Sequence, residues 1–157
     1  MEGNWELHLR GNLKGYEPWL ERVCPASVKG KMKVHGLVEN EELLSRIAEH
    51  DIGYAGELGV PASRNLTITN KLFQCLQAGL AVVASETAGQ NEATKSAPAA
   101  VMLFAPGDFR SLRDRLREYL TEKDRIDRAR SSAWEVGFNI KWEEESTRLL
   151  GSVGNGL

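Results

Sequence analysis

The clearest candidate for chemistry in this 157-residue sequence is the stretch Thr67–Lys71, where a helix is expected to begin. Thr69 or Asn70 can cap that helix, and Lys71 falls in its first turn. A helix start exposes unpaired N–H groups and about half a positive charge, so a lysine there is unfavourable unless an anion binds. A phosphate would use the same N–H groups. The pattern indicates a phosphate site, and a solvated lysine on a capped helix is the alternative that the residues leave open.

A second polar stretch, Ser85–Glu92, follows an apolar run and consists of small and polar residues. Gly89 would let a ligand or a neighbouring backbone approach closely. An ordinary turn from a strand to a helix explains the same residues. The glycines at 53, 56 and 59 are spaced three apart and do not match the dinucleotide-binding fingerprint.

Other kinds of site find little support in the sequence. The histidines His8, His35 and His50 are scattered, and Cys24 and Cys75 lack the spacing of zinc ligands. No Asp-x-Asp motif and no Walker-type loop occurs. We therefore expect no metal site.

Charge and hydropathy exclude several classes of protein. Lys and Arg number 20 against 22 Asp and Glu, so the basic footprint of a nucleic-acid-binding domain is missing. The longest apolar run, 99–105, is far shorter than the ~20 residues of a membrane-spanning helix. Two cysteines favour a reducing cytoplasm. The arginines between 110 and 130 alternate with acidic residues, which is typical of an ion-paired, solvated helical face.

These residues must be positioned by an alternation of strands and helices. Period-two and continuous apolar runs predict strands at 5–9, 32–35, 51–54, 80–84 and 101–104. Between them the pattern predicts helices at 16–23, from Asn40, and at 69–78 with Gly79 as its stop, a loop at 55–65, and a short helix within 87–95. This order predicts a Rossmann-like α/β fold, a parallel sheet with helices on both faces. Ligands then bind beyond the carboxyl ends of the strands, at loops 36–40, 55–70 and 85–92.

The C-terminal third is predicted to be helical. Asp108 is expected to cap a helix, and Thr121 and Asn139 to cap two more. On the first of these helices, Phe109, Leu112, Leu116 and Leu120 are in register on one apolar face. The tail 151–157 is expected to fray.

The stretch Asn70–Ser85 resembles a signature of nucleotide-sugar-dependent glycosyltransferases. The similarity is to the C-terminal, donor-binding domain of the GT-B fold in its large retaining group. Val34–Val38, Asp51–Gly53, Gly89–Glu92 and Phe138–Trp142 resemble further pieces of that domain, in the same order. The resemblance implies a single partial donor-binding domain over residues 1–157, with 108–157 as its closing helices.

The resemblance also implies roles for individual residues. Asn70 and Lys71, with Thr69 before them, would face the diphosphate. Gln74 stands where the family usually has a glutamate that binds the ribose. The turn that would receive the nucleotide base consists of His35, Gly36, Leu37 and Val38.

Three further positions complete the implied site. Gly89 and Glu92 would lie near the base and the ribose edge. Glu57 matches the glutamate that touches the donor sugar, and Lys71 and Glu57 would be the catalytic pair. Glu57 and Gln74 are seventeen residues apart, where the family normally has eight, and Leu58–Asn65 resembles an insertion.

The activity implied is retaining, metal-independent glycosyl transfer from a UDP- or GDP-linked sugar, with no cofactor. The family's domain opens with a strand and a Lys-Gly element before anything like Trp5–Leu9. The implied partner is therefore an N-terminal acceptor domain of the same parent chain, without which this chain is expected to be inactive. The expected location is the cytoplasm, with attachment to a membrane surface open to the parent protein.

Other functions fit parts of the pattern. The neutral Gln74 and the missing first strand suit a non-catalytic nucleotide-binding or interaction module derived from this fold. A nucleotide-sugar epimerase uses the same architecture. A receiver domain of flavodoxin type also has five strands, but it needs an acidic cluster at strand ends, and Asp51 begins its strand.

Overall fold

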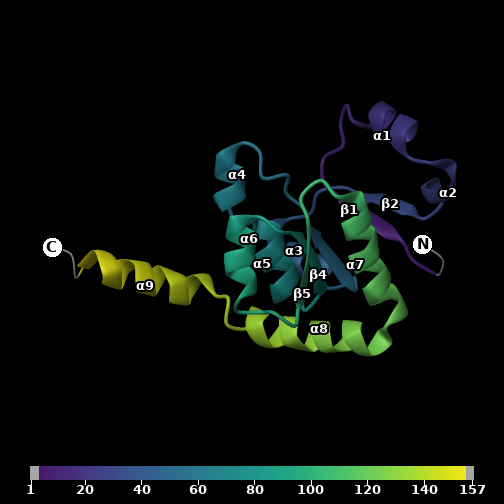
Figure 1. Ribbon diagram of the computed structural model, residues 1–157. Helices are drawn as coiled ribbons and strands as arrows, with labels where there is room; N and C mark the ends of the chain where they lie inside the picture. The colour runs from purple at the N-terminus through teal and green to yellow at the C-terminus, as the bar shows by residue number, and fades with distance from the viewer. Residues whose placement is uncertain (1–3, 155–157) are drawn as a thin grey trace. The chain divides into compact units, whose positions relative to one another are not determined.

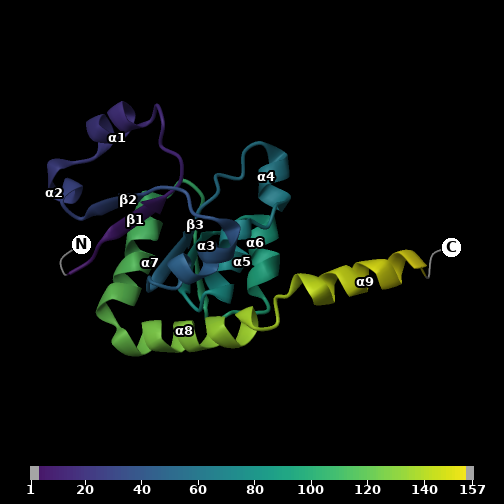
Figure 2. The ribbon, with the colours of Figure 1, turned by 180° about the vertical axis from the view of Figure 1, so that it is seen from behind.

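The computed structural model describes residues 4–154, without the side chains of 142–144, 153 and 154. Contacts within the chain divide it into two compact units, residues 1–43 and 44–157 (Figures 1 and 2). One helix, α3 (Asn40–Ile47), begins in the first unit and ends in the second. The prediction of one partial domain over 1–157 stays a prediction.

The first unit is a parallel strand pair with two short helices. Its strands are β1 (Leu7–Arg10) and β2 (Met32–His35), joined through α1 (Glu17–Val23) and α2 (Ala26–Lys29). None of residues 4–43 is fully buried, and Trp19 and Val34 are about half exposed. Within residues 4–43, therefore, no buried apolar core forms.

The second unit is built on a three-stranded parallel sheet in the order β3 (Ile52–Ala55), β4 (Ala81–Ser85) and β5 (Val101–Phe104). The central strand β4 is buried along its whole length. A continuous apolar run is typical of a strand covered on both faces, which explains why this strand could be predicted.

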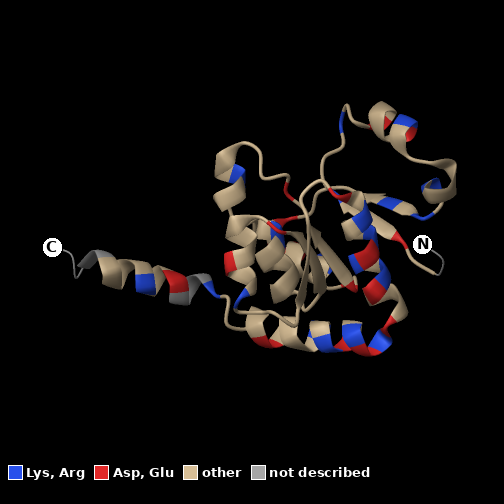
Figure 3. Ribbon diagram, in the orientation of Figure 1, with Lys and Arg blue, Asp and Glu red and all other residues tan. Residues whose placement is uncertain are grey.

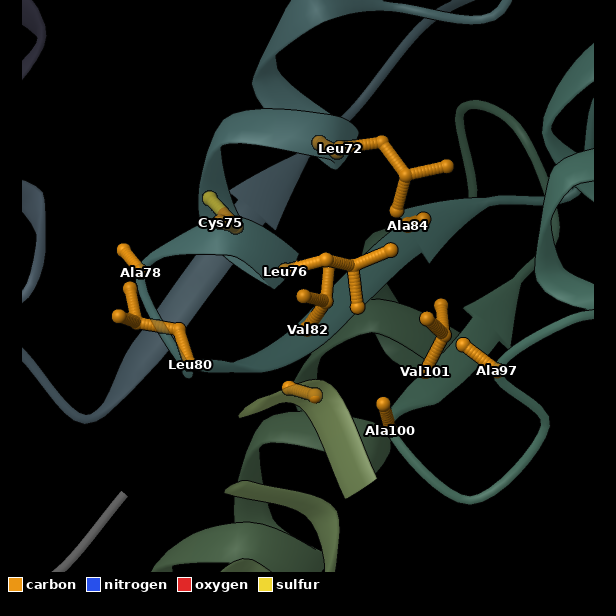
Figure 4. Packing of buried hydrophobic residues seen from close by; sticks show 12 residues of the cluster. Leu72, Cys75, Leu76, Ala78, Leu80, Val82, Ala84, Ala97, Ala100 and Val101 are labelled. Atoms are coloured by element: carbon orange, nitrogen blue, oxygen red, sulfur yellow. The ribbon is translucent and has the colours of Figure 1, made fainter. Parts of the chain in front are cut away.

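Helices cover both faces of this sheet, as predicted. α5 (Asn70–Gln77) and α6 (Ala88–Thr94) pack on one face, α7 (Phe109–Thr121) packs on the other, and α8 (Lys123–Gly137) contributes to both cores. The second unit also contains α4 (Ala62–Leu66), which packs against α6, and α9 (Trp142–Gly154). Because side chains alternate along a strand, Val82 and Ala84 of β4 face α5, whereas Ala81 and Val83 face α7 and α8. Figure 4 shows the first of these cores, where side chains of α5 point toward β4 and β5.

The end of α5 confirms the predicted stop at Gly79. Gly79 has φ +70°, a conformation that a residue with a side chain rarely adopts. Its N–H donates to Leu76 O, and the Leu80 N–H donates to Cys75 O, each at 3.0 Å. This is the Schellman pattern, and it turns the chain from α5 directly into β4.

The pairing of the strands differs from the expectation. The five strands are parallel where they pair, but they form two hydrogen-bonded groups, β1–β2 and β3–β4–β5, instead of one sheet. An alternating pattern identifies a strand without naming its neighbour. The expected loop 55–65 also contains the start of α4, a helix of only five residues.

Several expectations about the C-terminal helices are wrong. Thr121 is the last residue of α7, and its hydroxyl donates to Arg117 O instead of capping α8. The Asn139 side chain donates to Glu135 O at the end of α8 and does not cap α9. Phe109 and Leu120 are 81 % and 39 % exposed, whereas Leu112, Leu116 and Tyr119 of α7 pack in the core. The tail is helical through Gly154, and residues 155–157 lie outside the described residues.

The charges of α7 and α8 are interleaved, as Figure 3 shows. Arg115 and Arg125 both pair with Glu118, and Arg130 pairs with Asp51 at 2.7 Å. The prediction of an ion-paired face instead of a basic patch is confirmed. Asp108 also caps α7 as predicted, by accepting from the N–H groups of Arg110 and Ser111.

Candidate functional site

The carboxyl ends of β3, β4 and β5 lie at one edge of the parallel sheet, and the loops that leave this edge, with the helices that they lead into, carry the predicted residues of the second unit. The segment 56–69, with Glu57 and Thr69, runs from β3 through α4 to the start of α5, and residues 86–87 lead from β4 into α6. The other predicted residues of this unit lie on α5 and α6 themselves. In open parallel sheets this edge is where ligands bind. It is the place to look for the predicted chemistry.

The start of α5 is left open by the protein. Thr69 has the extended backbone of a capping residue (φ −82°, ψ 141°), yet its side chain makes no capping hydrogen bond. Its hydroxyl oxygen is buried and has no partner in the described part of the chain. Within residues 4–154, no acceptor meets the N–H groups of Asn70 and Lys71. These two amides are therefore available to an outside acceptor.

Lys71 adds a positive charge to this helix start. Its side chain is exposed, and no acidic side chain among the described residues lies within salt-bridge distance of it. One turn further along, burial raises the pKa of the Cys75 thiol to about 11, and the Lys71 charge partly offsets this effect. The positive end of α5 and the ammonium group thus act in the same region, and no acidic side chain of the described residues forms an ion pair there.

The start of α6, by contrast, is closed by the chain itself. Thr87 Oγ1 accepts from the Gln90 N–H at 3.3 Å, and Asn65 Oδ1 accepts from the Ala88 N–H at 3.1 Å. A Cβ atom on Gly89 would lie 2.5 Å from Leu66 O. Of the two possibilities for Gly89, a close ligand or a close backbone, the structure places the backbone of residues 66–67 against it.

Glu57, the predicted sugar contact, is held by both its main chain and its side chain. Its N–H donates to Ser85 Oγ at 2.7 Å, and its carboxylate lies 3.5 Å from the Arg64 guanidinium, with 14 % of the side chain exposed. Burial and the Glu57 charge together raise the pKa of Tyr54. The carboxylate is oriented and partly accessible, which suits it to accept hydrogen bonds from sugar hydroxyls.

The remaining predicted residues of this unit are less constrained. Gln74 lies in the second turn of α5 and is half-buried. Glu92 is exposed on α6 and pairs with Lys95. Neither position contradicts the expected role, and neither is held by a network like that of Glu57.

The predicted base-binding turn lies in the first unit. His35 ends β2, and its Nε2 lies 2.9 Å from His8 Nδ1 on the neighbouring strand, with the two rings stacked. Arg10 donates to Gly36 O at 3.2 Å, which fixes the start of the turn. Leu37 is 73 % exposed and Val38 is half-buried. The turn therefore presents main-chain groups and one apolar side chain.

Sequence reasoning missed Ser85, Gln90, Arg64 and Asn65, which organise this edge of the sheet. Ser85 and Gln90 are both completely buried. A signal was present for Gln90, since Thr87 and Gln90 have the Thr-x-x-Gln spacing of a capping box. The contacts of Arg64 and Asn65 join residues 7 and 23 positions apart and leave no local pattern.

Other kinds of site have little support in the structure. In the described part of the chain, no three His, Cys, Asp or Glu side chains gather where they could hold a metal ion. None of the helices in residues 4–154 combines the length and apolar character needed to cross a bilayer. An open groove of about 530 Å³ runs along β5, and its lining, which includes Glu86, Lys95 and Arg125, contains none of the predicted site residues.

Parallel strands flanked by helices define a Rossmann-like α/β fold of the kind found in GT-B glycosyltransferases. Among solved structures the chain is similar to HepE from Anabaena in complex with UDP-glucose, with a TM-score of 0.75 and 14 % identity. It is also similar to WaaG, a glycosyltransferase involved in lipopolysaccharide biosynthesis, with a TM-score of 0.61 and 15 % identity. The predicted fold class is confirmed.

These similarities cover nearly all of this chain but less than half of each similar protein. The match to HepE covers 97 % of this chain and 41 % of HepE, and the match to WaaG covers 87 % of this chain and 34 % of WaaG. No protein-family model and no curated protein sequence matches the chain. At this level of identity the likeness is one of fold, and function has to be argued from the site.

Proposed function

We propose that this chain is the donor-binding part of a glycosyltransferase that uses a UDP- or GDP-linked sugar. The observation that carries the proposal is the start of α5, where two main-chain amides and the unpaired Lys71 ammonium meet no acceptor among the described residues. A diphosphate fits this combination, because it accepts from helix N–H groups and neutralises the local charge. The fold likeness to a protein that has been solved with UDP-glucose supports the same choice of ligand.

The chemistry follows from where charge develops. When the bond between the sugar and the diphosphate breaks, negative charge grows on the diphosphate oxygens. The amides of Asn70 and Lys71 and the Lys71 ammonium would stabilise that charge in place, which is electrostatic catalysis by preorganised groups. The Glu57 carboxylate would hold the sugar hydroxyls and Gln74 the ribose. For the turn at His35–Val38 in the first unit, binding of the base stays a prediction from the sequence resemblance. Gly89 and Glu92 would border the base and ribose.

The finer features belong to the same proposal. Metal-independent transfer is supported by the missing Asp-x-Asp motif and by the cation that Lys71 supplies. Retention of the anomeric configuration rests on the sequence resemblance, and proton NMR of the first product formed would test it. The acceptor would bind to an N-terminal domain of the same parent protein. The simplest check is whether the gene encodes, before this segment, a further sequence long enough for an acceptor domain.

The proposal is tested by calorimetric titration of the parent protein with UDP and with GDP. Lys71→Ala should weaken binding about tenfold or more, since a hydrogen bond to a charged group contributes ~1.5–3 kcal/mol. Lys123→Ala is the matched control, because Lys123 also begins a helix but lies on α8. Equal affinities in the two variants would show that Lys71 does not contact the diphosphate.

A non-catalytic nucleotide-binding module is the second candidate, favoured by Gln74. A neutral amide in place of a carboxylate makes weaker hydrogen bonds to ribose hydroxyls, ~0.5–1.5 kcal/mol against ~1.5–3. Transfer of radiolabelled sugar by the parent protein separates the candidates. Steady turnover excludes the module, and nucleotide binding without turnover favours it.

A further inference from the structure

A buried amide and a buried hydroxyl lie directly under the loop that carries Glu57. The Gln90 side-chain N–H₂ group donates to Ser85 O at 3.1 Å and to Ser85 Oγ at 2.8 Å. The same Oγ accepts from the Glu57 N–H at 2.7 Å. Ser85 and Gln90 are each 0 % exposed. Three elements, the end of β4, α6 and the loop after β3, therefore meet at one oxygen atom.

The direction of every bond in this group is fixed by chemistry. Ser85 O is a carbonyl and can only accept, so the nitrogen of the Gln90 amide must face it. The two bonds into Ser85 Oγ use both of its lone pairs. Gln90 Oε1 consequently points elsewhere and has no hydrogen-bond partner within the described residues. In an interior of low dielectric such a group has one favourable arrangement and is costly to rearrange.

We propose that Gln90 and Ser85 are positioning residues for the Glu57 carboxylate in the donor site. The inference rests on the function proposed above. Gln90 holds the Ser85 hydroxyl, the hydroxyl holds the Glu57 N–H, and the backbone at Glu57 then sets the direction in which the carboxylate leaves the loop. Neither Gln90 nor Ser85 touches the donor, because neither side chain reaches the surface.

The effect is specific for the sugar part of the donor. The diphosphate is expected at the start of α5, which is held by apolar contacts of Leu72, Cys75 and Leu76. Loosening Glu57 leaves those contacts in place. Loss of the Gln90 amide should therefore weaken binding of a sugar nucleotide while leaving binding of the free nucleotide diphosphate nearly unchanged.

The test uses the parent protein and the variant Gln90→Met, which keeps the length and volume of the side chain and removes the amide. The matched control is Gln77→Met. Gln77 also donates one side-chain bond to a main-chain carbonyl, Ile140 O at 2.7 Å, but it ends α5 away from the carboxyl edge of the sheet. UDP, UDP-glucose, GDP and GDP-glucose are titrated into all three proteins, and hydrogen exchange is followed at the Glu57 amide.

We expect Gln90→Met to lower affinity for the sugar nucleotide by about fivefold to tenfold and to change affinity for the corresponding diphosphate less than about twofold. Exchange at the Glu57 amide should become faster in this variant alone. Equal losses for diphosphate and sugar nucleotide, or the same behaviour in Gln77→Met, would overturn the positioning role. If the wild-type protein binds no diphosphate at all, the proposed function fails and the inference fails with it.

Discussion

Two helices begin at the same edge of the three-stranded sheet, and each is preceded by a buried threonine with an extended backbone. Thr87 caps α6 by accepting from the Gln90 N–H, and Asn65 takes the Ala88 N–H as well. Thr69 occupies the same position before α5, but its hydroxyl accepts nothing. One helix start is thus closed by the protein and the other is open. Of these two starts, only that of α5 leaves its amides available to an outside acceptor, and Lys71 lies in its first turn.

The two helices also differ in what holds them. α5 buries Leu72, Cys75 and Leu76, an apolar stripe that packs on the sheet. α6 buries Gly89, Gln90 and Thr94, and relies on hydrogen bonds and close backbone contact. An apolar stripe secures α5 without help from its N-terminal amides. Helix α5 can therefore remain folded without an N-terminal cap, because burial of its apolar side chains already stabilises it.

The largest loss of stability is expected from a substitution at the closed start of α6. In Gly89→Ala the new Cβ would lie 2.5 Å from Leu66 O, a main-chain atom that cannot turn aside. The backbone has to move, and we expect a loss of about 1–3 kcal/mol in the free energy of unfolding. Urea unfolding measures it.

The control for that change is Gly151→Ala. Gly151 lies in α9, and among the described residues nothing beyond its chain neighbours and the backbone of its own helix lies within 4 Å of the Cβ it would gain. Alanine is the better helix former by about 0.5–1 kcal/mol, so this variant should be no less stable than the wild type. If Gly89→Ala behaves like Gly151→Ala, the backbone of residues 66–67 does not close the start of α6.

The apolar support of α5 predicts a dependence of stability on pH. Burial raises the pKa of Cys75 from 9.0 to about 11, so the folded protein keeps the thiol proton at a pH where the unfolded chain has lost it. The stabilisation is complete below about pH 9 and disappears as the pH rises toward 11. At pH 10 the free energy of unfolding of the wild type should be about 1.4 kcal/mol lower than at neutral pH because of Cys75. Cys75→Ala should not show this decrease.

The measurement is the difference in unfolding free energy between wild type and Cys75→Ala at pH 8 and at pH 10. Burial also raises the pKa of Tyr119, to about 12, but this residue is present in both proteins and cancels in the difference. If the difference in unfolding free energy does not change with pH, the Cys75 thiol on α5 is accessible to water and not buried.

A smaller effect is expected when the working cap is removed. Thr87→Val keeps the shape of the side chain but takes away the acceptor for the Gln90 N–H. The expected cost is about 1 kcal/mol in unfolding free energy. Measurement of the denaturant midpoint at constant m-value checks it, and an unchanged midpoint would remove the contrast between the two helix starts.

The parts of this arrangement that sequence predicts are those with local signals. The apolar run of β4, the stripe and glycine stop of α5, and Asp108 before α7 each carry their evidence within a few residues. Lys71 at a helix start was predicted in the same way, and the structure places it there. Its role toward a diphosphate stays a prediction.

The parts that sequence could not predict depend on distant partners. Asn65 closes a helix that begins 23 residues later, and Ser85 holds the main chain of Glu57 from 28 residues away. The contrast between Thr69 and Thr87 has only a weak local signal, since Gln90 follows Thr87 at the capping-box spacing and Leu72 stands at that position after Thr69. Strand pairing also depends on distant residues, because the hydropathy pattern of β1 does not indicate that β2 is its neighbour.

The smallest expected effect is at Thr69, and it is the sharpest test of the open start. Thr69→Val removes a buried hydroxyl that has no partner within residues 4–154, so no hydrogen bond is lost and the stability should stay equal or rise by less than about 1 kcal/mol. Because that oxygen is buried, UDP affinity should also change less than about twofold, in contrast to Lys71→Ala. A loss of stability as large as that of Thr87→Val would show that the hydroxyl caps α5 after all. A loss of UDP affinity as large as that of Lys71→Ala would make the hydroxyl, and not only the amides, a ligand of the diphosphate.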